Sequence, residues 1–391
     1  MSNTYLSIKT FTWDRDSHGL FDFETRGLAR KDFKLSSESY IIRSAGSITT
    51  VNPEEVTLAE DSKVLALVLS QERSFVLSKP TKALKRASCE SMWLVVKNIK
   101  PEASLKGYRL SGGDVMKLGR VKFKVVELFG VNSYEDSEST VRSDMLLKGG
   151  IGPKHKSAKK TALKVKKSAV TDEEVNCRIC LCGETEEDDP LIMPCNCTGT
   201  MGNVHLKCLQ QWLSGKITER TNHNSVTYTW KNFECELCKV QYPNSLKVGK
   251  DTYDLIKMKK PPNSYIILEA VKKDSNSANI LHVISLLNKN NIRLGRDHDS
   301  DIRIGDVSVS RNHATIKYTK SGLYLQDNNS KFGTLVQVKK PILLDFNTPV
   351  VVQTGRTLLN LSVSRSRNFF QCLCSCKSQD ESLLEDLNSL N

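Results

Sequence analysis

The sequence lacks the two features that direct a chain into a membrane. Its amino terminus, MSNTYLSIKTFTWDRD, has no basic start followed by an apolar core, so no secretory signal is expected. No uninterrupted apolar run approaches the roughly 18 residues that a membrane span needs. We therefore expect a protein without a transmembrane span, in the reducing cytoplasm, the nucleus or both. In such a compartment the twelve cysteines are more often free or metal-bound than joined in disulfides.

Acidic residues are absent from one basic stretch. Residues 148–168 contain eight lysines and no acid, and without them the formal net charge of +13 falls to +5. So modest a charge on the rest of the chain gives little reason to expect general nucleic-acid binding. We interpret residues 131–171 as a flexible basic linker, for which nuclear import or an anionic partner is the sharper alternative.

Large apolar side chains are also scarce between residues 177 and 238, where Cys and His accumulate. Eight of these Cys and His residues form four close pairs: Cys177 and Cys180, Cys195 and Cys197, His205 and Cys208, Cys235 and Cys238. Cys182 and His223 are left over. Zinc takes four thiolate or imidazole ligands in a tetrahedron, and a close pair can bind one ion from a single turn. Eight ligands predict two zinc ions, which would stabilise a segment too small for a core of its own. Scattered core cysteines are the alternative.

This pattern resembles the RING-CH, or RINGv, zinc domain. The order is four Cys, one His and three Cys, with CRIC at the start and CELC at the end. One residue between the third and fourth ligands and seven before the His distinguish it from a PHD finger. The resemblance implies a cross-brace with two structural zinc ions: Cys177, Cys180, His205 and Cys208 bind one, and Cys195, Cys197, Cys235 and Cys238 bind the other. The final gap of twenty-six residues is longer than is usual in the family.

The resemblance implies ubiquitin ligation. Such a domain docks a ubiquitin-conjugating enzyme and orients its thioester beside a substrate lysine, so no catalytic residue is expected in this chain. Ile179 and Trp212 match the apolar docking positions, and Lys239 matches a basic position that contacts ubiquitin. Core packing is the alternative interpretation of Trp212.

After Pro261 and Pro262, short runs rich in Ile, Val and Leu alternate with turns, which predicts a β-sandwich or a β-barrel. Its expected loops contain LGR, SRNHA and DNNSKFGT. Together these motifs resemble the forkhead-associated, or FHA, domain, an all-β sandwich that binds phosphothreonine peptides.

By this resemblance, a guanidinium, a hydroxyl and an ammonium bind the phosphate oxygens. The matching residues are Arg296, Ser310 and Lys331, with Arg311 as a peptide contact, His313 as a structural support of the loop, and Gly333 and Thr334 as shapers of the last loop. Many FHA domains have Thr-Asn where this chain has Lys331-Phe332, which leaves the preference for flanking peptide residues open. An FHA fold that has lost its ligand is the alternative.

The first 130 residues carry weaker signals. Several short apolar runs predict strands, and KLGRVKFKVVELF resembles the closing strands of an FHA domain, with a similar GR in VVVQTGRTLLNLSV. No SRxH loop lies among them. We expect an FHA-like sandwich that cannot bind phosphate by the usual route, or an unrelated β domain.

The sequence therefore predicts a mixed multidomain protein. The expected division is an extension (1–37), a β-rich domain (38–130), the basic linker (131–171), the RING-CH domain (172–245), a linker (246–262), the FHA domain (263–365) and a tail (366–391) whose Cys372–Cys376 could be acylated or could bind metal. We expect a ubiquitin ligase that recruits phosphothreonine-containing proteins. A non-catalytic phosphopeptide-binding adaptor is the main alternative, and a PHD-type chromatin reader is a third.

Overall fold

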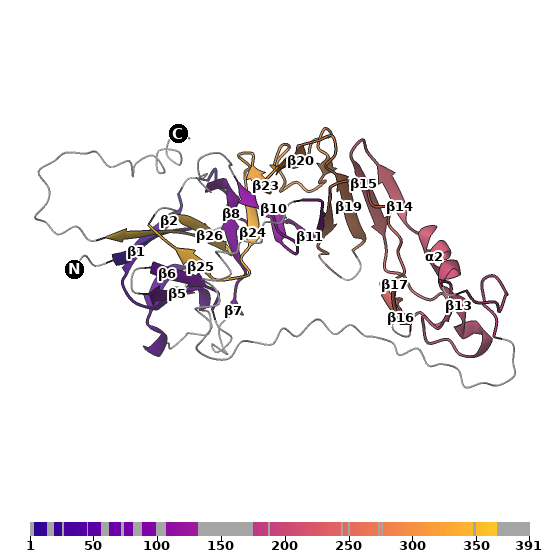
Figure 1. The fold of residues 1–391 in the computed structure, drawn as a ribbon. Coiled ribbons are helices and arrows are strands. Elements are labelled where there is room, and N and C mark those ends of the chain that lie inside the picture. The colour runs from indigo at the N-terminus through magenta and orange to yellow at the C-terminus, as the bar shows by residue number, and fades with distance from the viewer. Residues whose placement is uncertain are drawn as a thin grey trace, which may run out of the picture. The chain divides into compact units, whose positions relative to one another are not determined.

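The structure is a computed structural model of the chain. It describes residues 4–13, 19–25, 27–44, 46–55, 62–71, 74–80, 88–98, 107–131, 175–186, 188–243, 245–248, 251–272, 274, 277–346 and 349–365. The chain divides into two compact units, Met1–Val125 with Asn290–Asn391, and Val126–Lys289 (Figure 1). The expected tail with Cys372–Cys376, and the basic linker except Val131, lie outside the described residues.

Strands dominate both units, as the sequence predicts. Within the described ranges, the helices are α2 (Leu206–Ser214) and the short 3-10 helices η1 (Pro53–Glu55), η2 (Val96–Asn98) and η3 (Gly199–Gly202). Of these helices, none has the length and apolarity to cross a membrane.

The first unit contains one long run of paired strands in the order β10-β24-β8-β26-β27-β1-β2. Their bounds are β1 (Thr4–Thr12), β2 (Ala29–Leu35), β8 (Met92–Val95), β10 (Val115–Leu118), β24 (Thr334–Gln337), β26 (Val350–Thr354) and β27 (Thr357–Arg365). The stretch expected as an amino-terminal extension thus supplies β1 and β2 to this sheet.

Two further sheets complete the first unit. One has the order β25-β6-β5-β3-β4, with β7 paired to β5, and the other has the order β21-β20-β22-β23-β9. Their bounds are β3 (Ser39–Ser44), β4 (Ser47–Val51), β5 (Lys63–Gln71), β6 (Ser74–Ser78), β7 (Ser88–Cys89), β9 (Tyr108–Arg109), β20 (Asn291–Gly295), β21 (Ile302–Arg303), β22 (Ala314–Thr319), β23 (Gly322–Asp327) and β25 (Ile342–Leu344).

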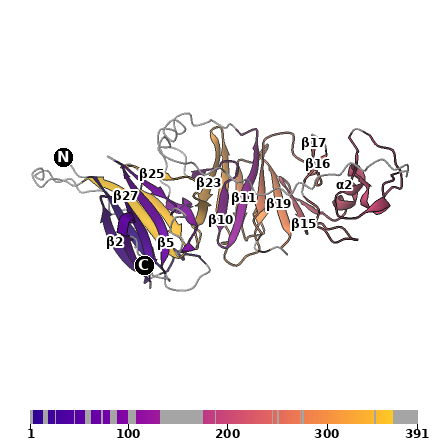
Figure 2. The ribbon, with the colours of Figure 1, turned by 90° about the horizontal axis from the view of Figure 1, so that it is seen from below.

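Strands from distant parts of the sequence alternate in these sheets. β27 pairs antiparallel with β1 over its whole length, from Thr4 opposite Arg365 to Thr12 opposite Thr357, and β25 pairs with β6. The amino-terminal strands β9 and β10 likewise pair with the carboxyl-terminal strands β23 and β24, respectively. Figure 2 shows yellow β27 among the indigo strands of the amino terminus. Carboxyl-terminal strands therefore complete sheets that the amino-terminal strands begin, and the reverse also holds.

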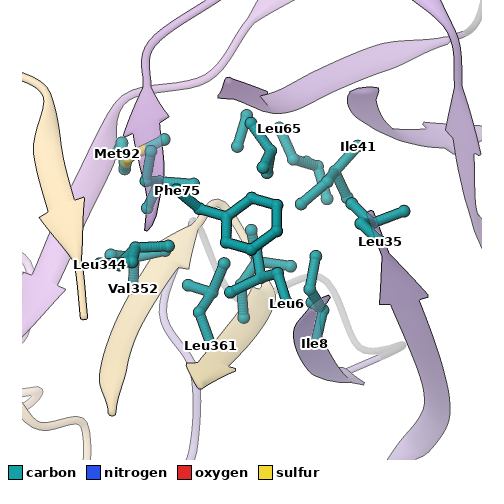
Figure 3. Close-up of a cluster of buried hydrophobic side chains, with 14 of the residues drawn as sticks. Leu6, Ile8, Leu35, Ile41, Leu65, Phe75, Met92, Leu344, Val352 and Leu361 are labelled. Carbon is teal, nitrogen blue, oxygen red and sulfur yellow. The ribbon is translucent and has the colours of Figure 1, made fainter. Parts of the chain in front are cut away.

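The main core of this unit has the same mixed origin. Leu6 and Ile8 of β1 alternate with outward residues, as a half-buried strand requires, and both are fully buried. Leu361 of β27 and Phe75 of β6 lie in the same cluster (Figure 3). Full burial of one such side chain contributes about 1.5–3 kcal/mol, so the two ends of the described chain stabilise each other.

The second unit contains the zinc-domain residues and a sheet built on β15. Its strands are β12 (Leu191–Ile192), β13 (Val204–His205), β14 (Thr218–Thr221), β15 (Ser225–Trp230), β16 (Ser245–Val248), β17 (Asp251–Asp254), β18 (Tyr265–Ala270) and β19 (Asn279–Ser285). β11 (Val121–Phe129) begins in the first unit and ends in the second.

The unusually long gap before the last two cysteines forms the hairpin β14-β15. β15 pairs antiparallel with β19, from Ser225 opposite Ile284 to Trp230 opposite Asn279. β18 and β19 are the first two strands expected of the FHA domain. Tyr228, Ile267 and Val283 pack together across this junction. The insertion thus joins the zinc-domain residues to a neighbouring sheet.

We predict that Leu361→Ala loosens β1 as well as β27. Loss of this buried side chain should lower the free energy of unfolding by about 2–5 kcal/mol, because a cavity remains in the shared core. Hydrogen exchange should then accelerate at the amides of residues 4–12 and 357–365 together. Leu343→Ala, at a half-exposed position of β25, is the matched control. Unchanged exchange in residues 4–12 would contradict the shared core.

Candidate functional site

The eight Cys and His residues lie in two groups. One contains Cys177, Cys180, His205 and Cys208, the other contains Cys195, Cys197, Cys235 and Cys238, and the ligand atoms of each group lie within 4.8 Å of one another. The Sγ atoms of Cys197 and Cys235 are 3.7 Å apart. With a Zn–S distance of about 2.3 Å, a tetrahedral edge measures about 3.8 Å, so the donor set and its spacing fit zinc.

Two equivalent turns supply a ligand pair each. In the first, Leu181 N–H donates to the carbonyl of Cys177 at 2.8 Å, and in the second, Lys239 N–H donates to the carbonyl of Cys235 at 2.9 Å. Leu181 and Lys239 both take a positive φ, 65° and 58°. The two-residue spacing is thus produced by one local backbone shape that occurs twice.

The ring of His205 is oriented by a carbonyl outside the cysteine group. Nε2 lies 2.7 Å from the carbonyl oxygen of Glu184, and Nδ1 lies 3.2 Å from Sγ of Cys180. Because only a protonated nitrogen can donate to a carbonyl, the hydrogen belongs on Nε2. Nδ1 then directs its lone pair at the cysteines, as a metal-binding histidine requires.

Each group also contains a thiol that ionises readily. Burial raises the pKa of Cys235, but the N–H groups of Cys238 and Leu237 outweigh this effect and bring it to about 5. The N–H of Cys182 lowers the pKa of Cys180 to about 6. Burial raises the pKa of Cys195 and of Cys208 to about 12, so within each group one cysteine ionises readily and another does so only when a cation is bound.

Arg178 links the two groups, and the sequence patterns did not single it out. It follows Cys177 in the chain, yet its guanidinium lies 3.8 Å from Sγ of both Cys197 and Cys235. It also donates to the hydroxyl of Tyr242 at 3.0 Å. Four thiolates around a divalent ion leave two negative charges, and this cation offsets part of them. The only sequence signal is a basic residue between two ligands.

The expected docking residues differ in accessibility. Ile179 is 43% exposed, whereas Trp212 is half-buried and packs edge-to-face on Tyr242 at 6.4 Å. The ammonium of Lys216 lies 3.6 Å from the centre of the Trp212 ring and 2.8 Å from Glu236. Trp212 therefore combines core packing with an outer face that Lys216 covers.

Two residues of the second turn are also exposed. Lys239 is exposed directly after the last ligand. Leu237, which is 55% exposed, has in the second turn the place that Ile179 has in the first. The matching CRIC and CELC motifs contain the sequence signal for Leu237. Trp212 also lines a hollow of about 560 Å³ together with Trp230 and Phe233.

In the first unit, the three expected FHA loops meet at Ser310. The N–H of Arg296 donates to the carbonyl of Ser310 at 3.1 Å, and the N–H of Lys331 donates to its Oγ at 3.1 Å. The second bond uses an acceptor position of the hydroxyl, so its O–H can donate to a phosphate oxygen. Arg296, Arg311 and Lys331 are all exposed. Backbone hydrogen bonds thus hold two of these exposed residues, Arg296 and Lys331, at Ser310.

Gly295 permits the close approach of two of these loops. A Cβ at this position would lie 1.9 Å from the carbonyl oxygen of Arg311, which no side chain tolerates. The glycine of LGR is therefore required by packing of the loop that precedes Arg296.

His313 is completely buried behind the loops. Its Nδ1 accepts the N–H of Ser310 at 3.0 Å, and its Nε2 lies 3.2 Å from the carbonyl oxygen of Gly333. This pair of partners fits a neutral ring that carries its hydrogen on Nε2. Burial lowers the pKa of His313, which favours the same neutral form.

Asp327 holds the last loop, a role that the sequence analysis did not assign. Its carboxylate accepts the hydroxyls of Ser330 and Thr334, both at 2.6 Å, and the N–H of Ser330 at 3.0 Å. Thr334 is fully buried, and Gly333 takes a φ of 68°. The turn before β24 is thus shaped by a small buried hydrogen-bond network.

Comparison with known proteins agrees with this geometry. The family model described as RING-variant domain matches residues 177–238, and the one described as FHA domain matches residues 292–359. The chain contains a RING-variant domain and an FHA domain. Both predicted resemblances are therefore confirmed.

Several curated proteins are similar to this chain over short segments. E3 ubiquitin-protein ligase marc-3 of Caenorhabditis elegans is 41% identical over 73 residues, 17% of this chain and 14% of the relative. E3 ubiquitin-protein ligase MARCHF1 of Homo sapiens is 42% identical over 66 residues, which are 17% of this chain and 18% of the relative. E3 ubiquitin-protein ligase MARCHF7 of Rattus norvegicus is 34% identical over 79 residues, which are 20% of this chain and 10% of the relative. The chain spans less than a fifth of the length of these relatives.

We predict that Arg178→Met weakens zinc binding by the RING-variant domain. Loss of a cation beside Cys197 and Cys235 should reduce affinity at the all-cysteine group about 10- to 100-fold, as removal of such outer supports commonly does. The rate of zinc release to a colorimetric chelator should show one accelerated phase and one unchanged phase. Arg220→Met, at an exposed position on β14, is the control. Two phases with wild-type rates would count against this role.

We also predict that acid destabilises the FHA domain through His313. Its pKa in the folded chain lies below the ordinary value of 6.5, so its contribution to stability is complete above pH 6.5 and is lost as the pH falls below it. His282 lies in the second unit, where burial lowers its pKa to about 4, so acid causes a loss of stability of the same sign there. His313→Gln should reduce the decrease in melting temperature between pH 7 and pH 5. The part of that decrease that His282 causes should remain. An unaltered slope in this variant would refute the assignment.

Proposed function

We propose that this protein is a RING-variant ubiquitin ligase that recruits phosphothreonine-containing proteins through its FHA domain. The observation that carries the proposal is the arrangement of the eight Cys and His residues in two closed groups beside exposed Ile179. Relatives that share this segment are named as ubiquitin ligases, which supports the same activity here.

Two zinc ions would be structural in this activity. Each group offers four protein ligands, which leaves no position on the metal for water or substrate. Bound zinc supplies cross-links that hold the two turns and α2 in place. We propose Cys177, Cys180, His205 and Cys208 as ligands of one ion, and Cys195, Cys197, Cys235 and Cys238 as ligands of the other.

The surface around Ile179 would dock a charged ubiquitin-conjugating enzyme. Ile179, Leu237 and the outer face of Trp212 supply apolar contacts, and Lys239 supplies a cation beside them. Transfer then requires a substrate lysine amine to attack the thioester carbonyl of the docked enzyme, which forms an isopeptide bond to ubiquitin and releases the cysteine thiol of that enzyme. The contribution of this chain is proximity and orientation, which can supply several orders of magnitude in rate without a nucleophile of its own.

The FHA loops would select the substrate. Arg296 can bind two phosphate oxygens at once, while the hydroxyl of Ser310 and the ammonium of Lys331 contact the others. Arg311 would contact the peptide beside the phosphate. Because both domains lie on one chain, capture of a phosphoprotein raises its effective concentration near the docked enzyme.

One observation favours a second candidate, a phosphopeptide-binding adaptor without ligase activity. The ammonium of Lys216 covers the Trp212 ring and is itself held by Glu236. A conjugating enzyme must displace Lys216 to reach this ring. If it cannot, the zinc domain is an interaction module alone.

The ligase is tested by the double variant Ile179→Ala with Trp212→Ala. Loss of two docking side chains should slow discharge of ubiquitin from a conjugating enzyme at least tenfold, because interface anchors of this type each contribute more than about 1 kcal/mol. Release of ubiquitin to free lysine is measured across a panel of conjugating enzymes. Val307→Ala, at a 78% exposed apolar position of the FHA domain, should leave the rate unchanged. No discharge by the wild-type chain with any enzyme would favour the adaptor.

A further inference from the structure

A short amino-terminal segment lies against the last loop of the FHA domain. The N–H of Phe23 donates to the carbonyl of Lys331 at 3.1 Å. Phe21 and Phe23 are buried in a cluster with Leu335, the second residue of β24. A Cβ at Gly333 would lie 2.6 Å from the Phe23 ring, so the ring occupies space that only a glycine leaves free.

This segment turns two carboxylates toward the cation of that loop. Oδ2 of Asp22 lies 3.5 Å from Nζ of Lys331, and Oε2 of Glu24 lies 3.9 Å from it. The other oxygen of Asp22 accepts the N–H of Glu24 at 3.0 Å, and the carbonyl of Asp22 accepts the N–H of Thr25 at 3.3 Å. The turn is therefore held by its own hydrogen bonds and anchored by two aromatic rings. The Asp22 side chain is only 14% exposed, so its position is set by packing.

We propose that the turn Asp22–Thr25 is a built-in acidic ligand of the FHA phosphate site, with which a phosphothreonine peptide must compete. This inference rests on the proposed phosphate-binding role of Arg296, Ser310 and Lys331. A phosphate dianion and the two carboxylates would share one ammonium and would repel each other at this distance. The turn thus lowers affinity for every phosphopeptide and favours those with enough additional contacts to displace it.

The burial of Phe21 and Phe23 makes this competition intramolecular. Their rings keep the carboxylates near Lys331 whether or not the ion pairs are formed, so the turn acts at a high effective concentration. The same anchoring allows a clean test, because Asp22→Asn and Glu24→Gln remove charge and leave both rings in place.

If the carboxylates supported peptide binding, their neutralisation would change the peptide affinity in the opposite direction. If Asp22 and Glu24 served to hold Lys331 ready for phosphate, their neutralisation would free the lysine and weaken peptide binding. Competition predicts tighter binding instead. Both ion pairs involve partly exposed groups, so we expect the loss of both carboxylate charges to change the peptide affinity roughly two- to tenfold.

The experiment uses the full chain and an arrayed library of phosphothreonine peptides, followed by fluorescence polarisation with the best binder. Four variants are compared with wild type: the double variant Asp22→Asn with Glu24→Gln, Arg296→Ala, and the controls Glu38→Gln and Lys340→Ala, which alter exposed charges elsewhere. Melting temperatures verify that each variant is folded. We expect two- to tenfold tighter binding by the double variant, loss of binding in Arg296→Ala, and wild-type affinity in both controls.

The outcomes separate the two proposals. Affinity that is unchanged or lower in the double variant, with binding still lost in Arg296→Ala, overturns the built-in ligand and leaves phosphate recognition standing. Binding that survives in Arg296→Ala, or that is undetectable in wild type and double variant alike, overturns phosphate recognition and with it the built-in ligand. Binding that becomes detectable only in the double variant supports both.

Discussion

The hydrogen-bonded pairing of β1 with β27 is the constraint on which the first unit depends. It runs without interruption from Thr4 opposite Arg365 to Thr12 opposite Thr357, and the hydroxyls of Thr12 and Thr357 meet at 3.1 Å at its end. Because side chains alternate along a strand, this register sends Leu6 and Leu361 into one core. It also delivers the chain beyond β1 to the neighbourhood of β24, where Phe23 packs on Gly333. The shape of the last FHA loop thus depends on β1, at the other end of the described chain.

The second unit is organised by a different constraint, the need to hold a small segment together without a large core. The apolar cluster of the zinc domain consists of a few residues such as Leu206, Leu209 and Leu213, together with the cysteines themselves. Metal ligation would supply the missing stability. Arg178 shows how closely the two ligand groups depend on each other, since it belongs to one turn by sequence and to the other by contact.

The sequence predicted the features that arise from local geometry. The ligand spacing reflects a turn of a few residues, and the motifs around Arg296, Ser310 and Lys331 reflect short loops, so each could be recognised without knowledge of distant contacts. The presence of strands could also be predicted from local sequence. The partner of each strand could not, because runs such as VKFKVVELF and TLLNLSV have the same propensity for either sheet, and only tertiary packing selects the neighbour. Arg178 and Asp22 escaped notice for the same reason, as their roles depend on residues far away in the sequence.

The pairing of β1 with β27 has a consequence for biosynthesis. Thr12 and its partner Thr357 are separated by 345 residues, so at about 5–20 residues per second the first strand waits roughly 17–70 s for its neighbour to leave the ribosome. During that time its edge is open to pairing with other chains. β2, which covers the opposite edge of β1, is rich in exposed charges such as Arg30, Lys31 and Lys34. These charges protect the outer edge of β2, whereas the edge of β1 that β27 covers stays open until the carboxyl-terminal strand is made.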